Sequence, residues 1–160
     1  MKNIKIETEL TVFENVQELP DSIQDLMNKA HQARKRAYAP YSNFMVGAAL
    51  LLDNGEVVEG NNQENASYPS GLCAERVAAF QAGALYPGVP FKAMAICASN
   101  DRLELNRPVP PCGACRQSLV EYELQQQRPF EVYFMGASGP IAMSKSIQSL
   151  LPWAFDKEML

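Results

Sequence analysis

Apolar residues in the first third of the chain recur at the spacing of a helix. Between Asp21 and Ala37 they return every three or four positions, which is typical of an amphipathic helix. Pro40 is expected to end this helix, and Asp21 or Ser22 is expected to cap its beginning. The only histidine, His31, lies within this stretch without a nearby Cys or His partner, so we interpret it as a surface or packing residue.

Short apolar runs further along predict strands, and two cysteine motifs mark where the other helices begin. The run at residues 46–52 is followed by Asp53-Asn54-Gly55, a strong hairpin signal, and a returning strand is expected over residues 56–60. Cys73 and the stretch Pro111-Cys112-Gly113-Ala114-Cys115 are expected to open the second and third helices. Further strands are predicted at residues 91–98, 130–135 and 141–143.

A hairpin followed by alternating helices and buried strands implies a mixed sheet with helices on both faces. The predicted fold class is therefore α/β, a three-layer α/β/α domain around a mixed five-stranded sheet. Residues 21–160 are predicted to form this single domain, and the β-prone residues 1–20 an N-terminal arm or edge strand. Both cysteine motifs fall at junctions of strand and helix, where such sheets bind ligands.

Composition and charge exclude several classes of protein. A chain of 160 residues that is 47% hydrophobic and 20% charged is typical of one globular domain. The net charge of −4 argues against a nucleic-acid partner, because binding to phosphate backbones needs clustered Lys and Arg. The first ten residues contain no long apolar run, so we expect no secretory signal, no membrane span and a cytoplasmic location. In that reducing compartment the four cysteines are not expected to form disulfides.

Three of these cysteines have the spacing of metal ligands. A Cys-x-x-Cys pair at a helix start lets one turn present the sulfurs of Cys112 and Cys115 to one ion, and the helix dipole favours the thiolate. Cys73, at the start of another helix, can supply a third sulfur. No convincing fourth ligand is present, because Cys97 falls within an apolar strand and His31 on a distant helix. The set predicts one Zn²⁺ per chain, with the open coordination position of a catalytic site.

Charged residues beside these cysteines are of the types that a hydrolytic zinc site needs. Glu75, two residues after Cys73, is placed to take a proton from the attacking water and pass it to a substrate nitrogen. Three thiolates make the site negative, so a cation should compensate for them. Arg76, one turn on from Cys73, is the stronger candidate for that role, and Arg116 is the weaker one.

These motifs resemble those of the zinc-dependent cytidine deaminases, in particular the small, homotetrameric type with three cysteine ligands. Cys73-Ala74-Glu75-Arg76 and the stretch that begins at Pro111 are similar to the Cys-x-Glu and Pro-Cys-x-x-Cys signatures of that family. Residues 1–20 lie outside the resemblance. It continues in order through residues 39–50, 60–69, 108–117 and 150–155.

The resemblance implies hydrolytic deamination of cytidine and deoxycytidine to uridine and deoxyuridine, with release of ammonia, in pyrimidine salvage. It implies that Glu75 protonates N3 of the base and then the leaving amine while water adds at C4. It also implies that Cys73, Cys112 and Cys115 bind zinc and that Arg76 moderates the charge of the thiolates. The implied partners are a small nucleoside and further copies of the chain, in a homotetramer with shared active sites.

The resemblance also assigns substrate-binding residues. Phe44 would stack on the pyrimidine, and Asn62 and Glu64 would hold the ribose 3′-hydroxyl. Two positions, Ala66 and Tyr68, would approach the 5′-hydroxyl from a neighbouring subunit. The remaining residues of the set are Ala74, beside the metal ligand, and Phe155, whose ring would enter a neighbour's pocket.

Other readings of the same motifs stay open at this point. A deaminase of the blasticidin S type shares the zinc motifs, although Asn62, Glu64 and Phe155 favour a nucleoside. A non-catalytic structural zinc protein would need a fourth ligand. A Cys-x-x-Cys thiol oxidoreductase would give Cys73 and Glu75 no role. An enzyme that edits polynucleotides would need a row of Lys and Arg to bind the strand. Three residues depart from the family's usual choices and bear on specificity: Met45, Asn61 and Trp153.

Overall fold

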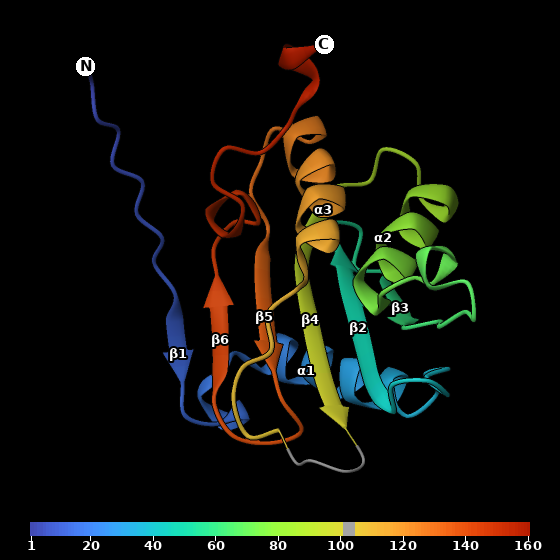
Figure 1. The fold of residues 1–160 in the computed structure, drawn as a ribbon. Helices are drawn as coiled ribbons and strands as arrows, with labels where there is room; N and C mark the ends of the chain where they lie inside the picture. The colour runs from blue at the N-terminus through green and yellow to red at the C-terminus, as the bar shows by residue number, and fades with distance from the viewer. Residues whose placement is uncertain (101–104) are drawn as a thin grey trace.

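The computed structural model describes residues 1–100 and 105–160, which fold around one mixed sheet (Figure 1). Within these ranges the sheet has six strands in the order β1-β6-β5-β4-β2-β3. β4 and β5 are parallel, and every other neighbouring pair is antiparallel. The strands are β1 (Thr11–Phe13), β2 (Phe44–Leu52), β3 (Val57–Asn61), β4 (Phe91–Asn100), β5 (Glu131–Met135) and β6 (Ile141–Ser144).

Helices cover both faces of the sheet, which confirms the predicted three-layer α/β/α architecture. α1 (Asp21–Arg34) lies behind the sheet in Figure 1, and α2 (Ala74–Leu85) and α3 (Gly113–Gln125) lie in front of it. Side chains alternate across β4, so that Ala95 and Cys97 pack in the core beneath α1 while Met94 and Ile96 pack in the core beneath α2 and α3. Cys97 is fully buried, as the apolar run around it predicted.

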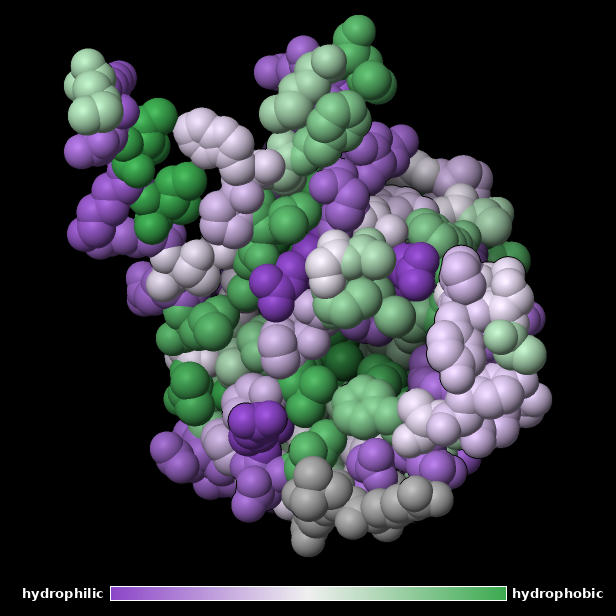
Figure 2. Space-filling view, viewed as in Figure 1, coloured by the Kyte–Doolittle hydropathy of each residue, from purple (hydrophilic) through white to green (hydrophobic). Residues whose placement is uncertain are grey.

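The strand count differs from the prediction, because the sheet has six strands where five were expected. The additional strand is β1, in which Thr11, Val12 and Phe13 pair with the outer edge of β6. Residues 1–10 continue from β1 as an exposed extended segment (Figure 2). In this segment the exposed apolar side chains Ile4, Ile6 and Leu10 alternate with charged residues.

The first helix begins and ends differently from the prediction. Asp21 is its first residue rather than its cap, and the residue before it, Pro20, makes no side-chain capping bond. The helix ends at Arg34, three residues before Ala37, because the chain tightens into i to i−3 turns over residues 35–37. Tyr38 then donates its N–H to Asn62 O over 3.0 Å, which directs the chain away from the helix axis.

Two glycines allow helices to approach the sheet closely. A Cβ on Gly47 would lie 2.1 Å from Ala30 O of α1, and a Cβ on Gly60 would lie 2.4 Å from Ala74 O of α2. Gly60 therefore brings the first turn of α2 directly against β3. This contact matters for function, because Cys73 immediately precedes that turn.

Of the residues that the structure describes, none lies in a helix both long and apolar enough to cross a lipid bilayer.

Candidate active site

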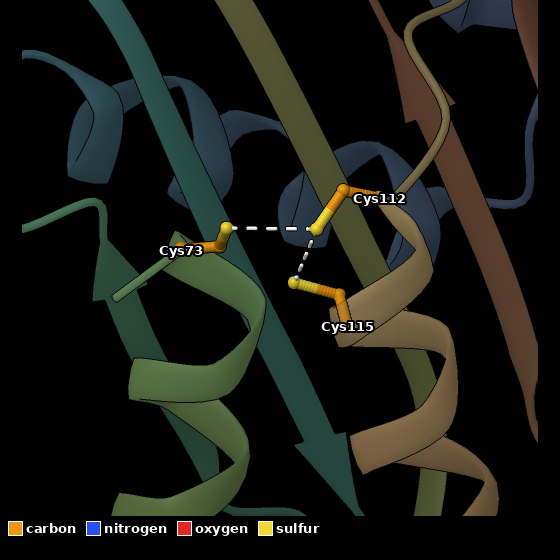
Figure 3. Close-up of side chains that lie close together, drawn as sticks. All are labelled: Cys73, Cys112 and Cys115. Atoms are coloured by element: carbon orange, nitrogen blue, oxygen red, sulfur yellow. Dashed lines mark hydrogen bonds between the residues drawn. The ribbon is translucent and has the colours of Figure 1, made fainter. Parts of the chain in front are cut away.

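Two of the three cysteines occupy equivalent positions at the starts of neighbouring helices. Cys73 is the N-cap of α2 and Cys112 is the N-cap of α3, each with an extended backbone. Cys115 lies one turn into α3, where it is fully buried. The three side chains point toward one another (Figure 3), with Sγ to Sγ distances of 3.7 Å between Cys73 and Cys112 and 3.6 Å between Cys112 and Cys115.

The spacing of these sulfurs fits a tetrahedral zinc ion. Zn–S bonds of about 2.3 Å at tetrahedral angles place any two sulfurs about 3.8 Å apart. All three Sγ atoms lie within 4.8 Å of one another, and no further His, Cys, Asp or Glu of the described residues joins the group. The four cysteines are free thiols. Three ligands with a fourth position open to water correspond to a catalytic rather than a closed structural site.

Arg76 supplies the positive charge that a three-thiolate site requires. Its Nη2 lies 3.8 Å from Cys73 Sγ, and its Nε is buried without a hydrogen-bond partner among the residues described. The pKa of Cys73 is lowered to about 5, chiefly by the hydrogen bond with Cys115 and further by Arg76. The hydrogen bond with Cys73, and then burial, raise the pKa of Cys115. The site therefore favours thiolate at Cys73 even before a metal replaces the protons.

Glu75 is the buried carboxyl group of the site. It lies in the first turn of α2, only 4% of its surface is exposed, and it lines the same cavity as Cys73 and Cys112. Burial raises the pKa of Glu75 to about 7, and the negative charge of Cys73 acts in the same direction. A carboxyl group with a pKa in this range can both accept and donate a proton near neutral pH.

The cavity in front of the cysteines has a volume of about 520 Å³. Its apolar wall consists of Phe44 and Val46 from β2 and Ile96 and Ala98 from β4. Its lining also includes residues of the polar loop that follows β3, among them Asn62 and Glu64. A slot between apolar side chains and a few fixed polar groups is typical of a small-molecule site.

Asn62 is fixed by hydrogen bonds to the start of β2, and Glu64 by hydrogen bonds to the segment just before β2. Asn62 Oδ1 accepts the N–H of Val46 over 2.8 Å, and its Nδ2 donates to Phe44 O over 2.9 Å. Glu64 accepts the N–H of Tyr41 over 2.9 Å, as well as the N–H and the hydroxyl of Ser42. Burial acts to raise the pKa of Glu64, but these hydrogen bonds outweigh it and lower the pKa. Both polar groups therefore face the cavity in a preset orientation.

The cavity brings together eight of the residues singled out from the sequence and leaves four outside its lining. Tyr68 belongs to the lining, although 76% of its surface is exposed. Ala66 is exposed and Ala74 is fully buried, and neither lines the cavity. Phe155 is 55% exposed on the C-terminal tail, away from this cavity. Cys115 is fully buried and does not line the cavity. The eight are Phe44, Asn62, Glu64, Tyr68, Cys73, Glu75, Arg76 and Cys112.

Sequence reasoning missed several residues of the lining. Ser42 and Tyr41 contact Glu64 across 22 and 23 residues of chain, a pairing that no local pattern announces. Val109 and Pro110 line the cavity directly before the cysteine turn. The signal that could have found these residues is their position inside the motifs at residues 39–50 and 108–117.

Comparisons with known proteins agree with this geometry. The family model described as "Cytidine and deoxycytidylate deaminase zinc-binding region" matches residues 20–128, a range that contains Glu75 and the three cysteines. The chain is 44% identical over 135 residues to a cytidine deaminase of Halalkalibacterium halodurans, which covers 84% of this chain and 95% of that protein. It is 41% identical over 139 residues to the cytidine deaminase of Sporosarcina psychrophila, which covers 86% of this chain and 94% of that protein.

A solved structure shows the same similarity in three dimensions. The crystal structure of cytidine deaminase from Burkholderia pseudomallei superposes with a TM-score of 0.71 at 42% sequence identity. The alignment covers 82% of this chain and 97% of that one.

Proposed function

Because this chain belongs to the cytidine and deoxycytidylate deaminase family, we propose that its cavity carries out zinc-dependent hydrolytic deamination of cytidine and deoxycytidine. The reaction consumes water, breaks the bond between C4 and its amino group, and yields uridine or deoxyuridine with ammonia. The observation that carries the proposal is the placement of a buried carboxyl group, Glu75, in one cavity with the cysteine ligands. Release of uracil nucleosides fits a role in pyrimidine salvage.

Cys73, Cys112 and Cys115 are the residues that would hold the zinc ion. Bound zinc supplies the nucleophile by lowering the pKa of a coordinated water toward neutrality. Glu75 would take one proton of the water at its carboxylate and deliver it to N3 of the base. It would then take the second proton from the hydroxyl group added at C4 and pass it to the departing amine. Arg76 holds the thiolates by charge and hydrogen bonding, which limits the negative charge that the carboxylate of Glu75 experiences.

The walls of the cavity suit a nucleoside in this orientation. The ring of Phe44, with Val46 and Ile96, forms the apolar face against which a pyrimidine stacks. Asn62 and Glu64 are assigned to the sugar hydroxyl, because a site built to pair a hydroxyl group strongly disfavours ligands that lack it. This polar pair favours a nucleoside over a blasticidin S-type substrate. The open coordination position and the adjoining cavity favour a catalytic over a structural zinc protein.

We further infer that the active sites are shared within a homotetramer. Tyr68 at the cavity mouth and Phe155 on the tail are both strongly exposed aromatic residues, as expected for side chains that contact a neighbouring subunit. In this arrangement Ala66 and Tyr68 face a neighbour's substrate, and Phe155 closes a neighbour's cavity. Ala74, between Cys73 and Glu75, is assigned to substrate binding in its own chain, although its buried side chain does not line the cavity. A cytoplasmic location remains a prediction from the sequence.

The experiment that tests the function compares substrates with one metal-analysed preparation. Purified protein is incubated with cytidine, deoxycytidine, cytosine, dCMP and blasticidin S, and ammonia and the deaminated products are quantified. We expect rapid turnover of the two nucleosides, lost on removal of zinc and restored by its return. If zinc-loaded protein turned over another compound and neither nucleoside, the sugar-binding assignments would be wrong. If it turned over none of them, a structural role for zinc would replace the proposal.

A further inference from the structure

Arg116 follows the ligand Cys115 directly, yet the contacts of its side chain lie elsewhere. Its Nε donates to Pro111 O over 2.8 Å, and its Nη1 donates to Leu150 O over 2.7 Å. The weaker expectation that Arg116 compensates for the charge of the thiolates therefore has no contact to support it. One guanidinium instead joins the residue before Cys112 to the end of the short 3₁₀ helix Gln148–Leu150.

We propose that Arg116 is a positioning residue that couples the metal-binding turn, residues 111–115, to the C-terminal segment, residues 147–155. This inference rests on the proposed metal site and is independent of the identity of the substrate. Its consequence is that the order of the C-terminal segment depends on metal occupancy. The same segment carries Phe155, so metal loss in one chain would also disturb the aromatic residue that this chain presents outward.

Further hydrogen bonds attach the C-terminal segment among the described residues: two come from α3, and in another Thr8 Oγ1 donates to Ser149 O over 2.8 Å. Glu123 accepts the N–H of Ile147 over 2.7 Å, which fixes the start of the segment where Ile147 is fully buried. Gln117 donates its Nε2 to Phe155 O over 2.8 Å. Glu123 lies two turns from the cysteines, whereas Arg116 and Gln117 lie within two residues of Cys115. The contacts that α3 makes with Leu150 and Phe155 therefore come from the turn next to the metal ligands, while Thr8 and the burial of Leu150 also hold the middle of the segment.

The chemistry of the guanidinium group explains why this link responds to the turn. Its donors lie in one rigid plane, so the two carbonyl groups must keep a fixed relative position for both bonds to form. Pro111 is fully buried and directly precedes Cys112. A shift of Cys112 after metal loss moves Pro111 O, and Arg116 then loses either that bond or the one to Leu150.

The chain contains one tryptophan, Trp153, which lies in the C-terminal segment two residues before Phe155 and is 69% exposed. Its fluorescence therefore reports on this segment alone. We would record time-resolved anisotropy of Trp153 with zinc bound, after chelation, and after zinc is returned, with zinc content measured in each sample. The decay separates local motion of the indole ring from tumbling of the whole particle. Removal of zinc should raise the amplitude of the fast component roughly two- to threefold, as when an ordered segment becomes flexible.

The matched variant is Arg116→Gln, which keeps the polarity and removes the planar fork. It should show the raised fast component with zinc fully bound, and chelation should add little to it. Arg116→Lys, which can reach one carbonyl group, should lie between the two. The control Arg128→Gln makes the same change of charge just beyond the other end of α3, at an exposed ion pair with Asp53, and should behave like the parent protein.

Several outcomes would overturn the proposal. The parent protein alone can overturn it: the anisotropy decay of Trp153 would stay the same while the zinc content falls from one ion per chain to none. The proposal would also be wrong if the Arg116→Gln protein bound zinc and kept the anisotropy decay of the parent protein. If Arg116→Gln does not fold, the same comparison is made with Arg116→Lys. If the protein deaminated cytidine but its Trp153 decay did not change with zinc, the coupling would be refuted and the proposed function would stand. If the Trp153 decay depended on zinc but the protein deaminated none of the substrates, the coupling would stand and the proposed function would be wrong.

Discussion

Glu75 is subject to opposing influences within a few ångströms. Burial and the charge of Cys73 favour its protonated form, while its backbone hydrogen bond and Arg76 favour the carboxylate. The net result is a group that changes its protonation state at little free-energy cost near neutral pH. That property suits a residue that moves one proton to N3 and a second to the leaving amine.

Replacing Glu75 by Gln should separate proton transfer from metal binding. The amide fills the same volume and cannot carry the proton, so kcat is expected to fall by about 10²–10⁴. Zinc content should stay at that of the parent protein, because none of the three ligands changes. Steady-state kinetics and metal analysis of the same samples test this, and a variant within a few fold of the parent kcat would remove Glu75 from the mechanism.

Replacing Cys112 by Ala should affect metal binding, in contrast to the replacement of Glu75. Loss of one of three sulfurs should reduce zinc content to a small fraction and lower the midpoint of thermal unfolding, since a metal that binds only the folded chain stabilises it. Full zinc occupancy in this variant would exclude Cys112 from the ligand set.

Glu123 gives a prediction about pH and stability that is unrelated to catalysis. Burial raises its pKa above the ordinary 4.5, although Ser146 and the N–H of Ile147 donate hydrogen bonds to it. The folded protein thus binds this proton more tightly than the unfolded chain does. The stabilising contribution is complete below the unfolded pKa and is lost as the pH rises through the raised folded pKa.

The non-titrating variant Glu123→Gln isolates this effect. The difference in unfolding free energy, parent minus variant, should decrease as the pH is raised from 4 to 8, as measured by chemical denaturation at each pH. Glu121→Gln, at an exposed position on the same helix, is the control and should show no such trend. A difference that increased with pH would mean that the hydrogen bonds outweigh burial at Glu123.

At the scale of elements, the height of the metal-binding helix above the sheet is set by a glycine. The space that a Cβ of Gly60 would need is occupied by backbone atoms of α2, with Ala78 N only 2.6 Å away. Gly113, the first residue of α3, has no atom within 4 Å of the same position. One glycine is therefore required by packing, and the other, beside the ligands, is not.

Gly60→Ala should push the start of α2 outward and move Cys73 with it. We expect a loss of about 1–3 kcal/mol in unfolding free energy from overpacking, together with weaker zinc binding. Gly113→Ala should be neutral or stabilising by up to about 1 kcal/mol through helix propensity. Denaturant titration and a zinc competition assay on both variants make the comparison, and equal effects at the two positions would contradict it.

The sequence predicted the elements that repeat a pattern for long enough, and it left open the bounds of elements that depend on distant partners. Three helices and the hairpin at Gly55 were predicted because periodicity and turn residues are local signals. Residues 1–20 were predicted only as an arm or edge strand, and the three-residue edge strand β1 within them is fixed by pairing with β6, about 130 residues away. The early end of α1 likewise follows from the contact of Tyr38 with Asn62, which the apolar spacing up to Ala37 does not reveal.

The same limit applies to the site. The metal ligands were predictable because residue type and spacing of cysteines encode coordination directly. The contacts of Ser42 with Glu64 and of Arg116 with Leu150 were not, because each depends on how distant segments pack. The resemblance named Asn62 as a sugar ligand, and the structure adds that its amide also ties the loop to β2.

At the scale of the whole molecule, several large exposed apolar side chains indicate further contacts. Phe155, Met159 and Leu160 lie on the C-terminal tail, which projects from the body in Figure 2, and Tyr68 lies at the cavity mouth. An isolated chain would leave this apolar surface in water at a cost of roughly 25 cal/mol per Å². The proposed homotetramer would cover it.

Mixing two inactive variants tests whether sites are shared. Chains of Glu75→Gln and of Phe155→Ala should recover part of the activity after subunit exchange, because a Phe155→Ala chain supplies an intact Glu75 and its neighbour an intact Phe155. Mixing Glu75→Gln with Glu64→Ala should recover none, since both residues line the cavity of one chain. Absence of recovery in the first mixture, with exchange verified by mass, would place Phe155 in its own chain's site.

The close approach of three sulfurs is also a redox liability. Cys73 Sγ and Cys112 Sγ lie 3.7 Å apart, so a modest side-chain movement brings them to the disulfide bond length of about 2 Å. Oxidation of that pair would remove two electrons and two ligands in one step, and zinc could not rebind until a reductant restored the thiols. Bound zinc blocks this reaction by engaging the sulfurs. In air, the metal-free protein should therefore lose the activity that zinc can restore far faster than the zinc-loaded protein loses its activity. This lost activity should return only when a reductant and zinc are added together.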